Sequence, residues 1–415
     1  MLDSLFPRVS KKCLALPLFG PVIEDFSEWL SQQGYTRLHR RAVLNIVRKL
    51  DRYLWRKGIR RLEDITSLTL DRYWRILRRR APWEAGAVRL VKRFLKMRGG
   101  LNHCPVITPT DLQVAEYAQY LREVRGLAPS TLGEQRRIAA GFLAYLDFDK
   151  APERLAHIGP GEIEGFVRKL GKSLSRATLQ GKVLSLRAFL RFLATTGKVA
   201  PGLADQVDSP RVYRREKLPR TLPWKTVQAL LQSIPKTTVK GRRDYTMLFL
   251  LATYGLRSCE LVALTLDDLD WRAGLIRIRQ TKTRNEIKLP LTDEATSVLI
   301  EYLRHVPRPA GYRELFFQVR APIRPLRREA LREAFEIWAK RSGLDIPFCG
   351  PHCLRHAYAH HLLRQGTALK TIGDLLGHRS PESTVSYLRL ATEELREVGL
   401  PVPQPISKKG GRHET

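Results

Sequence analysis

The chain has few cysteines and lacks the sequence features of a membrane or secreted protein. Its five cysteines among 415 residues are scattered, and no two have CxxC spacing: Cys13, Cys104, Cys259, Cys349 and Cys353. The set therefore indicates neither a disulfide framework nor a cysteine-based zinc site. No apolar run reaches transmembrane length, and the first residues lack the pattern of a signal peptide. We expect a cytoplasmic protein with no membrane partner.

Acidic residues are also scarce relative to basic ones. The chain has 41 Asp and Glu against 73 Lys and Arg, which gives a formal net charge of +32. So large an excess implies a polyanionic partner, most simply nucleic acid. The basic residues are spread along the chain, which favours a protein that wraps its partner. A basic membrane-binding protein would need an amphipathic anchor or a lipidation signal, and the sequence shows neither.

Helical periodicity dominates the first half of the chain. Apolar residues recur at helical spacing over residues 23–30 and 43–54. Gly34, Gly58 and the pair Gly99-Gly100 interrupt the pattern. The length of the chain suggests two or three domains, and we predict that residues 1–104 form an extra N-terminal helical domain.

A second helical block, predicted over residues 105–207, begins at Thr108-Pro109-Thr110 and is similar to the first. Three stretches of the first block match three of the second in order, namely Phe26-x-x-Trp29-Leu30 with Tyr117-x-x-Tyr120-Leu121, Tyr53-Leu54 with Tyr145-Leu146, and Arg93-Phe94-Leu95 with Arg191-Phe192-Leu193. The matches suggest a weak internal repeat of about a hundred residues. Amphipathic helices can also align by chance, so both interpretations remain open.

The remaining sequence predicts a linker, a mixed domain and a tail. Residues 208–219 are charged, contain two prolines and lack an apolar period, as expected of a linker between domains. The domain predicted over 220–400 contains an apolar helix at 244–254, a hairpin formed by strands 275–279 and 287–291, and helices at 293–304, 326–339, 352–365 and through Tyr387. Residues 401–415 are rich in Pro, Lys and Gly and predict a mobile tail.

Short motifs in the predicted domain 220–400 contain residues suited to a phosphodiester. Arg257 lies in Gly-Leu-Arg-x-x-Glu-Leu, where Glu260 is placed to orient it. His352-x-x-Arg355 puts a histidine and an arginine one helical turn apart on one side of a helix. Guanidinium groups match the non-bridging oxygens of a phosphate and stay charged at any working pH.

A histidine and a tyrosine complete the set. Gly377-His378 is followed nine residues after the histidine by Tyr387. A free phenol has a pKa of about 10 and is a weak nucleophile at neutral pH. Nearby arginines would stabilise the phenolate and so lower the barrier to attack.

The order and spacing of these motifs resemble the tyrosine recombinase (phage integrase) family. The resemblance is strong over about 222–400 and moderate over about 110–207, where it suggests a helical core-binding, SAM-like domain. It implies a mainly α fold: helical N-terminal DNA-binding domains and a mixed α-helical catalytic domain with a small β-hairpin sheet, closing as a C-shaped clamp on duplex DNA. It also implies six catalytic residues: Arg257, Lys282, His352, Arg355, His378 and Tyr387.

The resemblance assigns each of these residues a role. Tyr387 is the nucleophile and forms a 3′-phosphotyrosyl link to DNA. His352 and His378 donate to the scissile phosphate or take the tyrosine proton. Lys282, at the tip of the predicted hairpin, is the general acid for the leaving 5′ oxygen, ahead of Arg284 and Lys288.

The resemblance further implies a site-specific recombinase that needs no metal, cofactor or ATP. Its partners would be double-stranded DNA, further copies of itself as a dimer to tetramer, and accessory or sister recombinases. The C-terminal residues 394–405 are expected to dock on a neighbouring copy. Integration, excision or transposition of a mobile element in a bacterial cell is the favoured role, with the protein associated with the nucleoid when bound to DNA.

Three alternatives compete with this interpretation. The first is a regulator that binds DNA without cutting it, and the second is a type IB topoisomerase, which uses the same tyrosine chemistry. The third is a zinc hydrolase, because His352, His356 and His360 recur every four residues on one predicted helix. That helix lacks the glutamate of the metalloprotease motif, and Arg355 adds a repelling cation. We therefore expect His356 and His360 to pack or to form hydrogen bonds.

Overall fold

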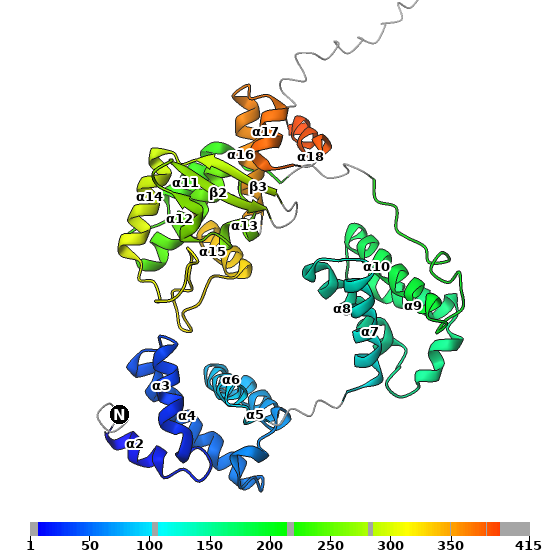
Figure 1. Cartoon of the computed structure of the whole chain (residues 1–415), viewed down its shortest axis with the longest axis vertical. Helices are drawn as coiled ribbons and strands as arrows, with labels where there is room; N and C mark the ends of the chain where they lie inside the picture. Colours follow the sequence, from blue (N-terminus) through cyan, green and yellow to red (C-terminus); the bar gives the residue numbers. More distant parts are fainter. Residues whose placement is uncertain are drawn as a thin grey trace, which may run out of the picture. The chain divides into compact units, whose positions relative to one another are not determined.

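The computed structural model describes residues 7–101, 107–213, 220–280, 285–348, 350–378 and 380–390. The chain divides into two compact units. One is formed by residues 1–102 together with 217–415, and the other by residues 103–216. Both are built mainly from helices, and the first also contains a small antiparallel sheet (Figure 1).

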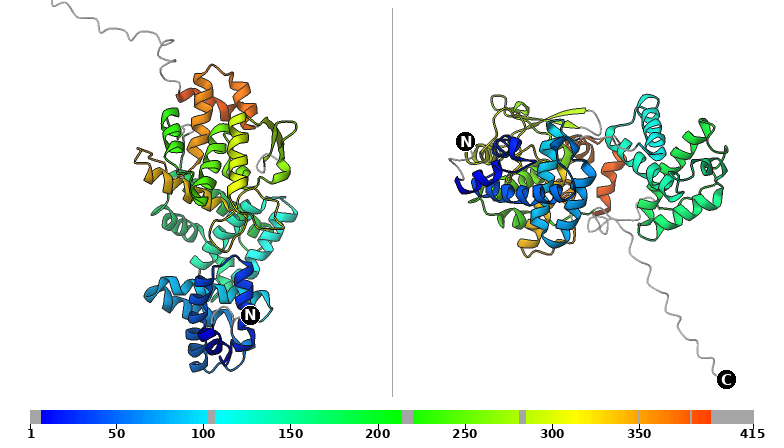
Figure 2. Two further views of the ribbon diagram at one scale, coloured as in Figure 1. Left: turned by 90° about the vertical axis from the view of Figure 1, so that its left-hand side faces the viewer. Right: turned by 90° about the horizontal axis from the view of Figure 1, so that it is seen from below.

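The first hundred residues form a helical block with its own hydrophobic core. Helix α4 has α2, α3 and α6 packed against it (Figures 1 and 2). Its elements are α2 Pro7–Leu14, η1 Gly20–Val22, α3 Ile23–Gln32, α4 Arg37–Arg56, η2 Leu62–Asp64, α5 Ser67–Arg80 and α6 Pro82–Met97. Thr36 and Thr66 accept backbone hydrogen bonds at the first turns of α4 and α5, as N-cap residues do.

The unit of residues 103–216 has a second helical core. Its elements are α7 Pro109–Glu123, α8 Pro129–Tyr145, η3 Pro152–His157, α9 Pro160–Gly171 and α10 Arg176–Thr195. Helix α7 begins at the Thr108-Pro109 signal seen in the sequence: Thr108 caps it in a capping box with Asp111, and Pro109 is the first helical residue.

The two helical blocks share an order of elements and an aromatic contact. After α2 and η1, which have no described counterpart in the second block, the first block has two helices, a 3₁₀ turn and two further helices, and the second block has the same order. In the first block the rings of Phe26 and Trp29 lie 5.0 and 5.8 Å from that of Phe94. In the second, Tyr117 and Tyr120 lie 5.0 and 5.1 Å from Phe192. The residues that match in the sequence therefore occupy corresponding places in the two cores.

The part from residue 220 onward is organised around a buried helix, α12 Val239–Tyr254. Every residue from Arg243 to Ala252 is buried, because α11, α13, α14, α15 and α16 all pack against it. The other helical elements are α11 Trp224–Gln232, α13 Ser258–Val262, η4 Leu266–Asp268, α14 Asp293–His305, α15 Arg328–Arg341, α16 His352–Arg364, α17 Leu369–Leu376, α18 Pro381–Val385 and η5 Ser386–Leu390.

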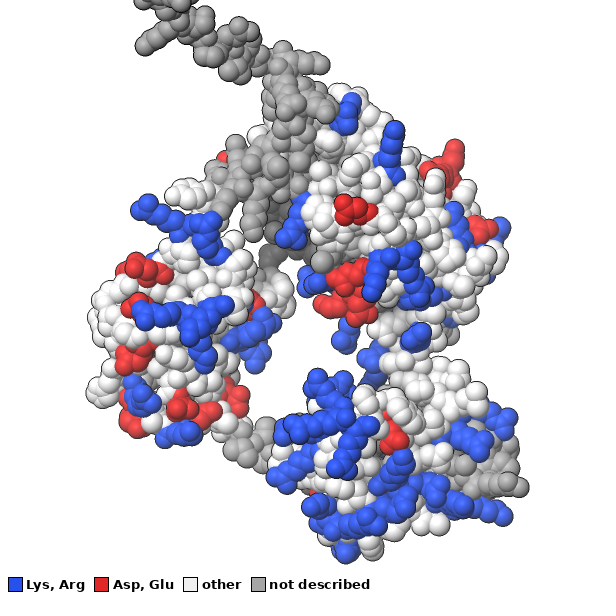
Figure 3. Space-filling view, turned by 180° about the vertical axis from the view of Figure 1, so that it is seen from behind, with Lys and Arg blue, Asp and Glu red and all other residues white. Residues whose placement is uncertain are grey.

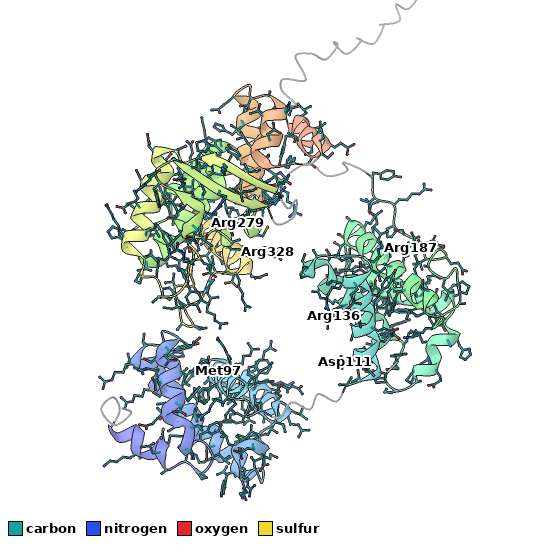
Figure 4. All side chains as sticks on the ribbon, in the orientation of Figure 1. Met97, Asp111, Arg136, Arg187, Arg279 and Arg328 are labelled. Atoms are coloured by element: carbon teal, nitrogen blue, oxygen red, sulfur yellow. The ribbon has the colours of Figure 1, made fainter. Side chains whose placement is uncertain are left out.

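The predicted hairpin is confirmed as two strands of a three-stranded antiparallel sheet. The strands are β1 Leu269–Asp270, β2 Leu275–Gln280 and β3 Asn285–Pro290, in that order. Ile278 pairs with Ile287, and Gln280 pairs with Asn285 at the last described position before the tip. Arg279, labelled in Figure 4, extends from β2 to the buried Asp268, with 2.7 Å between Nη2 and Oδ1. The short strand β1 was not predicted from the sequence.

Two expectations about elements need correction or lie outside the described residues. The helix predicted to run through Tyr387 ends at Val385, and Tyr387 lies on the 3₁₀ turn η5 instead. The predicted tail and the docking segment 394–405 fall outside the described residues, as do Lys282 and Arg284. None of the helices in the described ranges combines the length and the apolar character that crossing a bilayer requires.

Candidate active site

Arg257 is fixed at the junction between α12 and α13. Helix α12 ends at Gly255, whose φ of +59° is in the left-handed region. A Cβ there would lie 2.6 Å from the ring of Tyr358, so both the conformation and the space require glycine. Glu260, almost fully buried, accepts hydrogen bonds from the backbone N–H of Arg257 (2.8 Å) and from its Nη1 (2.6 Å). Glu260 thus orients the arginine, as expected.

Arg355 is held by two backbone carbonyl groups. It lies on α16 and is only 2% exposed. Its Nη1 donates to the carbonyl of Gly255 and its Nη2 to that of Leu376, each at 2.7 Å. Burial, followed by the repulsion of Arg257, lowers the pKa of Arg355 to about 10, so it remains charged at neutral pH. The two contacts connect the ends of α12 and α17 to one guanidinium group.

Tyr387 is buried with its hydroxyl against a histidine. The side chain is 2% exposed and packs in a small apolar cluster with Ala359, Ile372 and Leu376. Its Oη lies 3.1 Å from Nδ1 of His356. Hydroxyl and imidazole groups at this distance share a proton, and its direction depends on the histidine tautomer.

Burial raises the pKa of Tyr387 above its ordinary value. The positive charges of Arg355 and Arg257 favour the phenolate and lower the pKa, in the expected direction, but they offset only part of the effect of burial. The two arginines thus do not by themselves ionise the phenol. Ionisation requires a group that accepts its proton.

His378 follows the glycine that ends α17. Gly377 has a φ of +62°, and a Cβ at this position would clash with the side chain of Gln280. His378 then places its Nδ1 2.8 Å from Oγ1 of the buried Thr384, and its ring stacks on that of Tyr387 with a centroid separation of 6.3 Å. Burial and nearby cations, Arg355 first, lower the pKa of His378 to about 4.

The end of strand β2 is hydrogen-bonded to the end of α17, beside Arg355. Nε2 of Gln280 donates to the carbonyl of Leu376 at 3.2 Å, the oxygen that also accepts from Arg355. The described end of β2 is thus fixed beside the site. Lys282, the predicted general acid, is two residues further along the chain and outside the described residues.

The histidines of α16 separate into different environments. His352 is exposed at the first turn, with its ring edge-on to that of His356 at 4.6 Å. His361 stacks flat on Trp224 at 4.2 Å and so packs α16 against α11. Among the described residues, no three His, Cys, Asp or Glu side chains come together in a group that could hold a metal ion.

Four of the six predicted residues are brought together: Arg257 and Arg355 both lie close enough to His378 and Tyr387 to lower the pKa values of those two groups. His352 lies at the edge of this group and contributes to the low pKa of His378. Sequence reasoning did not assign a catalytic role to His356, the histidine that contacts the tyrosine. The signal in the sequence that could have identified His356 was its position one helical turn after His352 and next to Arg355.

Comparison with known proteins agrees with this geometry. The model of the phage integrase family matches residues 220–394, and that of the phage integrase N-terminal SAM-like domain matches residues 114–197. A protein of Sinorhizobium fredii, named as an integrase/recombinase, is 33% identical over 403 residues, which cover 94% of this chain and 97% of the relative. The chain belongs to the phage integrase family, the tyrosine recombinases.

Other tyrosine recombinases cover less of the chain. The tyrosine recombinase XerD of Listeria innocua is 31% identical over 291 residues, 69% of this chain and 96% of XerD. Structures of XerH bound to difH substrate before cleavage, and to palindromic difH after it, superpose with a TM-score of 0.52. They are 20% and 19% identical and cover 69% of this chain and 84% and 83% of XerH. The predicted mainly α recombinase fold is confirmed.

Membership of the family also confirms the predicted class of activity. The protein is a tyrosine-type DNA strand transferase, and its reaction is site-specific DNA recombination. This favours the recombinase over the regulator and the topoisomerase considered from the sequence. Both family models begin after residue 113, so neither matches the first helical block.

Proposed function

We propose that this recombinase cuts DNA by attack of Tyr387 Oη on a phosphodiester. The new bond joins the tyrosine oxygen to the 3′ phosphate, and the bond to the 5′ oxygen of the next nucleotide breaks. The observation that supports this most directly is the position of the tyrosine hydroxyl, 3.1 Å from His356 and beside the buried Arg355. A nucleophile in contact with a base, next to fixed cations, is the arrangement that covalent catalysis requires.

We assign the tyrosine proton to Nδ1 of His356. Burial, with the neighbouring His352 and Arg355, lowers the pKa of His356 to about 4, so its ring is neutral at pH 7 and has a lone pair available. With the ring proton on Nε2, Nδ1 accepts from the phenol as the Oη–phosphorus bond forms. This assignment differs from the role for His352 or His378 that the family resemblance suggested.

The phosphate is held by Arg257 and Arg355. Glu260 neutralises one of these cations, so the pair keeps a net positive charge for the extra negative charge that the phosphate carries in the transition state. His378 and the exposed His352 supply further hydrogen bonds to the non-bridging oxygens. Lys282 protonates the leaving 5′ oxygen, and the fixing of Gln280 beside Leu376 supports a hairpin that reaches the site.

The second step reverses the first with a different strand. A 5′ hydroxyl from the partner strand attacks the phosphotyrosyl phosphorus and loses its proton to the lysine, while Tyr387 takes back a proton from His356. One phosphodiester is broken and one formed, so the energy of the bond is conserved and no nucleotide hydrolysis is needed.

The proposed partners are double-stranded DNA and further copies of this chain, as a dimer to tetramer, with sister recombinases as accessory partners. The XerH structures support DNA as partner, because XerH is bound to difH substrate in both. We place the reaction in the integration, excision or transposition of a bacterial mobile element, with the protein at the nucleoid. The integrase/recombinase name of the relative that matches 94% of this chain supports this role.

We propose five parts for the chain. Residues 1–104 are a second copy of the core-binding domain, a proposal supported by the shared element order and aromatic contacts. Residues 105–207 are the core-binding domain itself, 208–219 the linker, 220–400 the catalytic domain and 401–415 a tail.

The test is covalent trapping on a suicide substrate, a duplex from the flanks of the gene nicked beside the suspected site. Wild-type protein should form an adduct that survives denaturing electrophoresis and addition of a chelator. Tyr387→Phe should form none. Tyr358→Phe, a half-buried tyrosine on α16 with no assigned role, is the matched control and should form the adduct. Binding without an adduct by the wild type would contradict the mechanism and favour a regulator.

A further inference from the structure

The first helical block, which neither family model matches, carries a large share of the chain's excess positive charge. Residues 37–98 contain 20 Lys and Arg against 5 Asp and Glu, whereas residues 107–213, which include the matched SAM-like domain, contain 15 against 11. Figure 3, with the first block at the lower right, shows one of its faces largely covered by basic side chains. This part of the first block, which lies outside both family models, is therefore more basic relative to its length than the block that contains the SAM-like domain.

The charges in this block are arranged around a tryptophan. The guanidinium carbons of Arg89 and Arg78 lie 4.4 and 5.2 Å from the ring centre of Trp74, where α5 meets α6. Two surface hollows meet at this side chain. One is lined also by Arg75, Arg89 and the ion-paired Asp71 and Lys92, and the other by Arg75, Arg78 and Arg79. We call Trp74 with these four arginines the α5–α6 surface.

The arginines of this surface have no acidic partners. Among the described residues no ion pair joins any of the four to a carboxylate, since Asp71 pairs with Lys92 and Glu84 with Lys49. In the second block many basic side chains are neutralised, and the pairs include Arg137–Glu134, Lys150–Asp147, Arg168–Glu164, Lys182–Glu134, Arg191–Asp205 and Lys198–Glu116. Stacking on the indole orients two of the guanidinium groups without reducing their charge.

We propose that the α5–α6 surface binds the phosphate backbone of duplex DNA without reading its sequence. The proposal rests on the recombinase function and adds a second contact with the same DNA, away from the scissile phosphate. Arg78 and Arg89 already stack on Trp74, and the indole is only partly exposed, so it is poorly placed to take an unpaired base. Backbone contact by arginine therefore fits better than the base stacking typical of single-strand binding.

The test measures binding of the full chain to a short duplex of mixed sequence over a series of salt concentrations. One variant replaces all four arginines by glutamine: Arg75→Gln, Arg78→Gln, Arg79→Gln and Arg89→Gln. Each lost phosphate contact should reduce the slope of log affinity against log salt by about 0.9, so the total reduction should be about 3 to 4. Affinity should fall at least about tenfold at physiological salt.

A second variant replaces the same arginines by lysine and is the matched control. It retains the charge, so its salt slope should stay close to that of the wild type. If the glutamine variant does not fold by circular dichroism, the double variant Arg75→Gln/Arg79→Gln leaves both stacking contacts intact and should lose about 2 in slope. Single strands of the same sequence, used as competitor, should bind less tightly than the duplex.

Two results would overturn the proposal. One is a folded glutamine variant with the affinity and salt slope of the wild type. The other is a loss of binding confined to single strands, which would assign the surface to a different ligand. Neither depends on Tyr387, because the binding assay involves no cleavage. Absence of the phosphotyrosyl adduct in the trapping experiment would contradict the proposed cleavage chemistry. It would not affect the proposal for the α5–α6 surface, which is tested by the salt dependence of DNA binding.

Discussion

A single hydrogen bond of 3.1 Å joins Nδ1 of His356 to Oη of Tyr387 across 31 residues of sequence. The histidine is on α16, whose inner face is part of the main core, while the tyrosine belongs to the small apolar cluster at the end of the described chain. This hydrogen bond therefore connects a helix of the main core to the small cluster that holds the tyrosine.

Replacing His356 by alanine should slow DNA cleavage by about 10²- to 10⁴-fold, the usual contribution of a positioned acid or base. The pKa of His356 is about 4, so the base is present above that pH and is lost as the pH falls through it. Imidazole added to His356→Ala should restore part of the rate. His360→Ala, one turn further along α16, is the control and should cleave normally. Equal rates for both variants would assign the tyrosine proton to another group.

Glu260→Gln should weaken the site through Arg257. The change retains the shape of the side chain but removes the buried charge that accepts two hydrogen bonds from the arginine. We expect a loss of about 1–3 kcal/mol in the free energy of unfolding and at least a tenfold slower cleavage. Glu301→Gln, a well-exposed carboxylate on α14, is the control and should change neither quantity. Stability is measured by denaturant unfolding and cleavage by adduct formation.

Gly377→Ala should be more harmful than the same change at another left-handed glycine. Gly343 has a φ of +69° with nothing near its missing Cβ, so Gly343→Ala should cost about 1–2 kcal/mol of stability and leave cleavage intact. At Gly377 the added methyl group also meets Gln280, which must move. We therefore expect greater destabilisation and slower cleavage. If the two variants behaved alike, contact with Gln280 would be unimportant.

The stability of the protein should fall as the pH is lowered from about 6.5 to about 4. The pKa of His378 is about 4 in the folded protein, below its ordinary value of 6.5, so the unfolded chain binds more protons in this interval. The contribution of the neutral ring is complete above pH 6.5 and is lost as the pH falls. Thermal melting of wild type and His378→Gln at several pH values should show a weaker pH dependence in the variant. If the melting temperatures of the two proteins depended on pH in the same way, the lowered pKa of His378 would be contradicted.

Removal of the segment after Leu390 should separate DNA binding from assembly. If residues 394–405 dock on a neighbouring copy, truncation should abolish tetramers on DNA and leave duplex binding largely intact. The assay is size analysis of complexes on a two-site DNA, with a chain shortened only from residue 406 as control. Tetramers formed by the truncated chain would contradict the docking role.

Local signals predicted the elements well. Thr108-Pro109 marked the start of α7, and the strand predicted over 275–279 corresponds to β2, because caps and periodicity act over a few residues. The change from α-helix to 3₁₀ turn before Tyr387 was missed. It depends on packing against α16 and α17, which a local pattern does not contain.

The site was predictable as a set of residues but not as a set of contacts. The motifs placed Arg257, His378 and Tyr387 in one site. Which histidine meets the tyrosine depends on how η5 packs against α16, and the rise in the pKa of Tyr387 depends on the depth of burial. These are properties of contacts between distant residues, so the sequence pattern left them undetermined.

The carbonyl of Leu376 receives hydrogen bonds from both Gln280 and Arg355. One oxygen atom thus accepts hydrogen bonds both from the strand that leads to the hairpin tip and from the arginine proposed to hold the phosphate. The last described residue of β2 and the buried arginine are thus anchored at the same backbone position, where α17 ends. A shift of this one carbonyl group would therefore alter both hydrogen bonds at once.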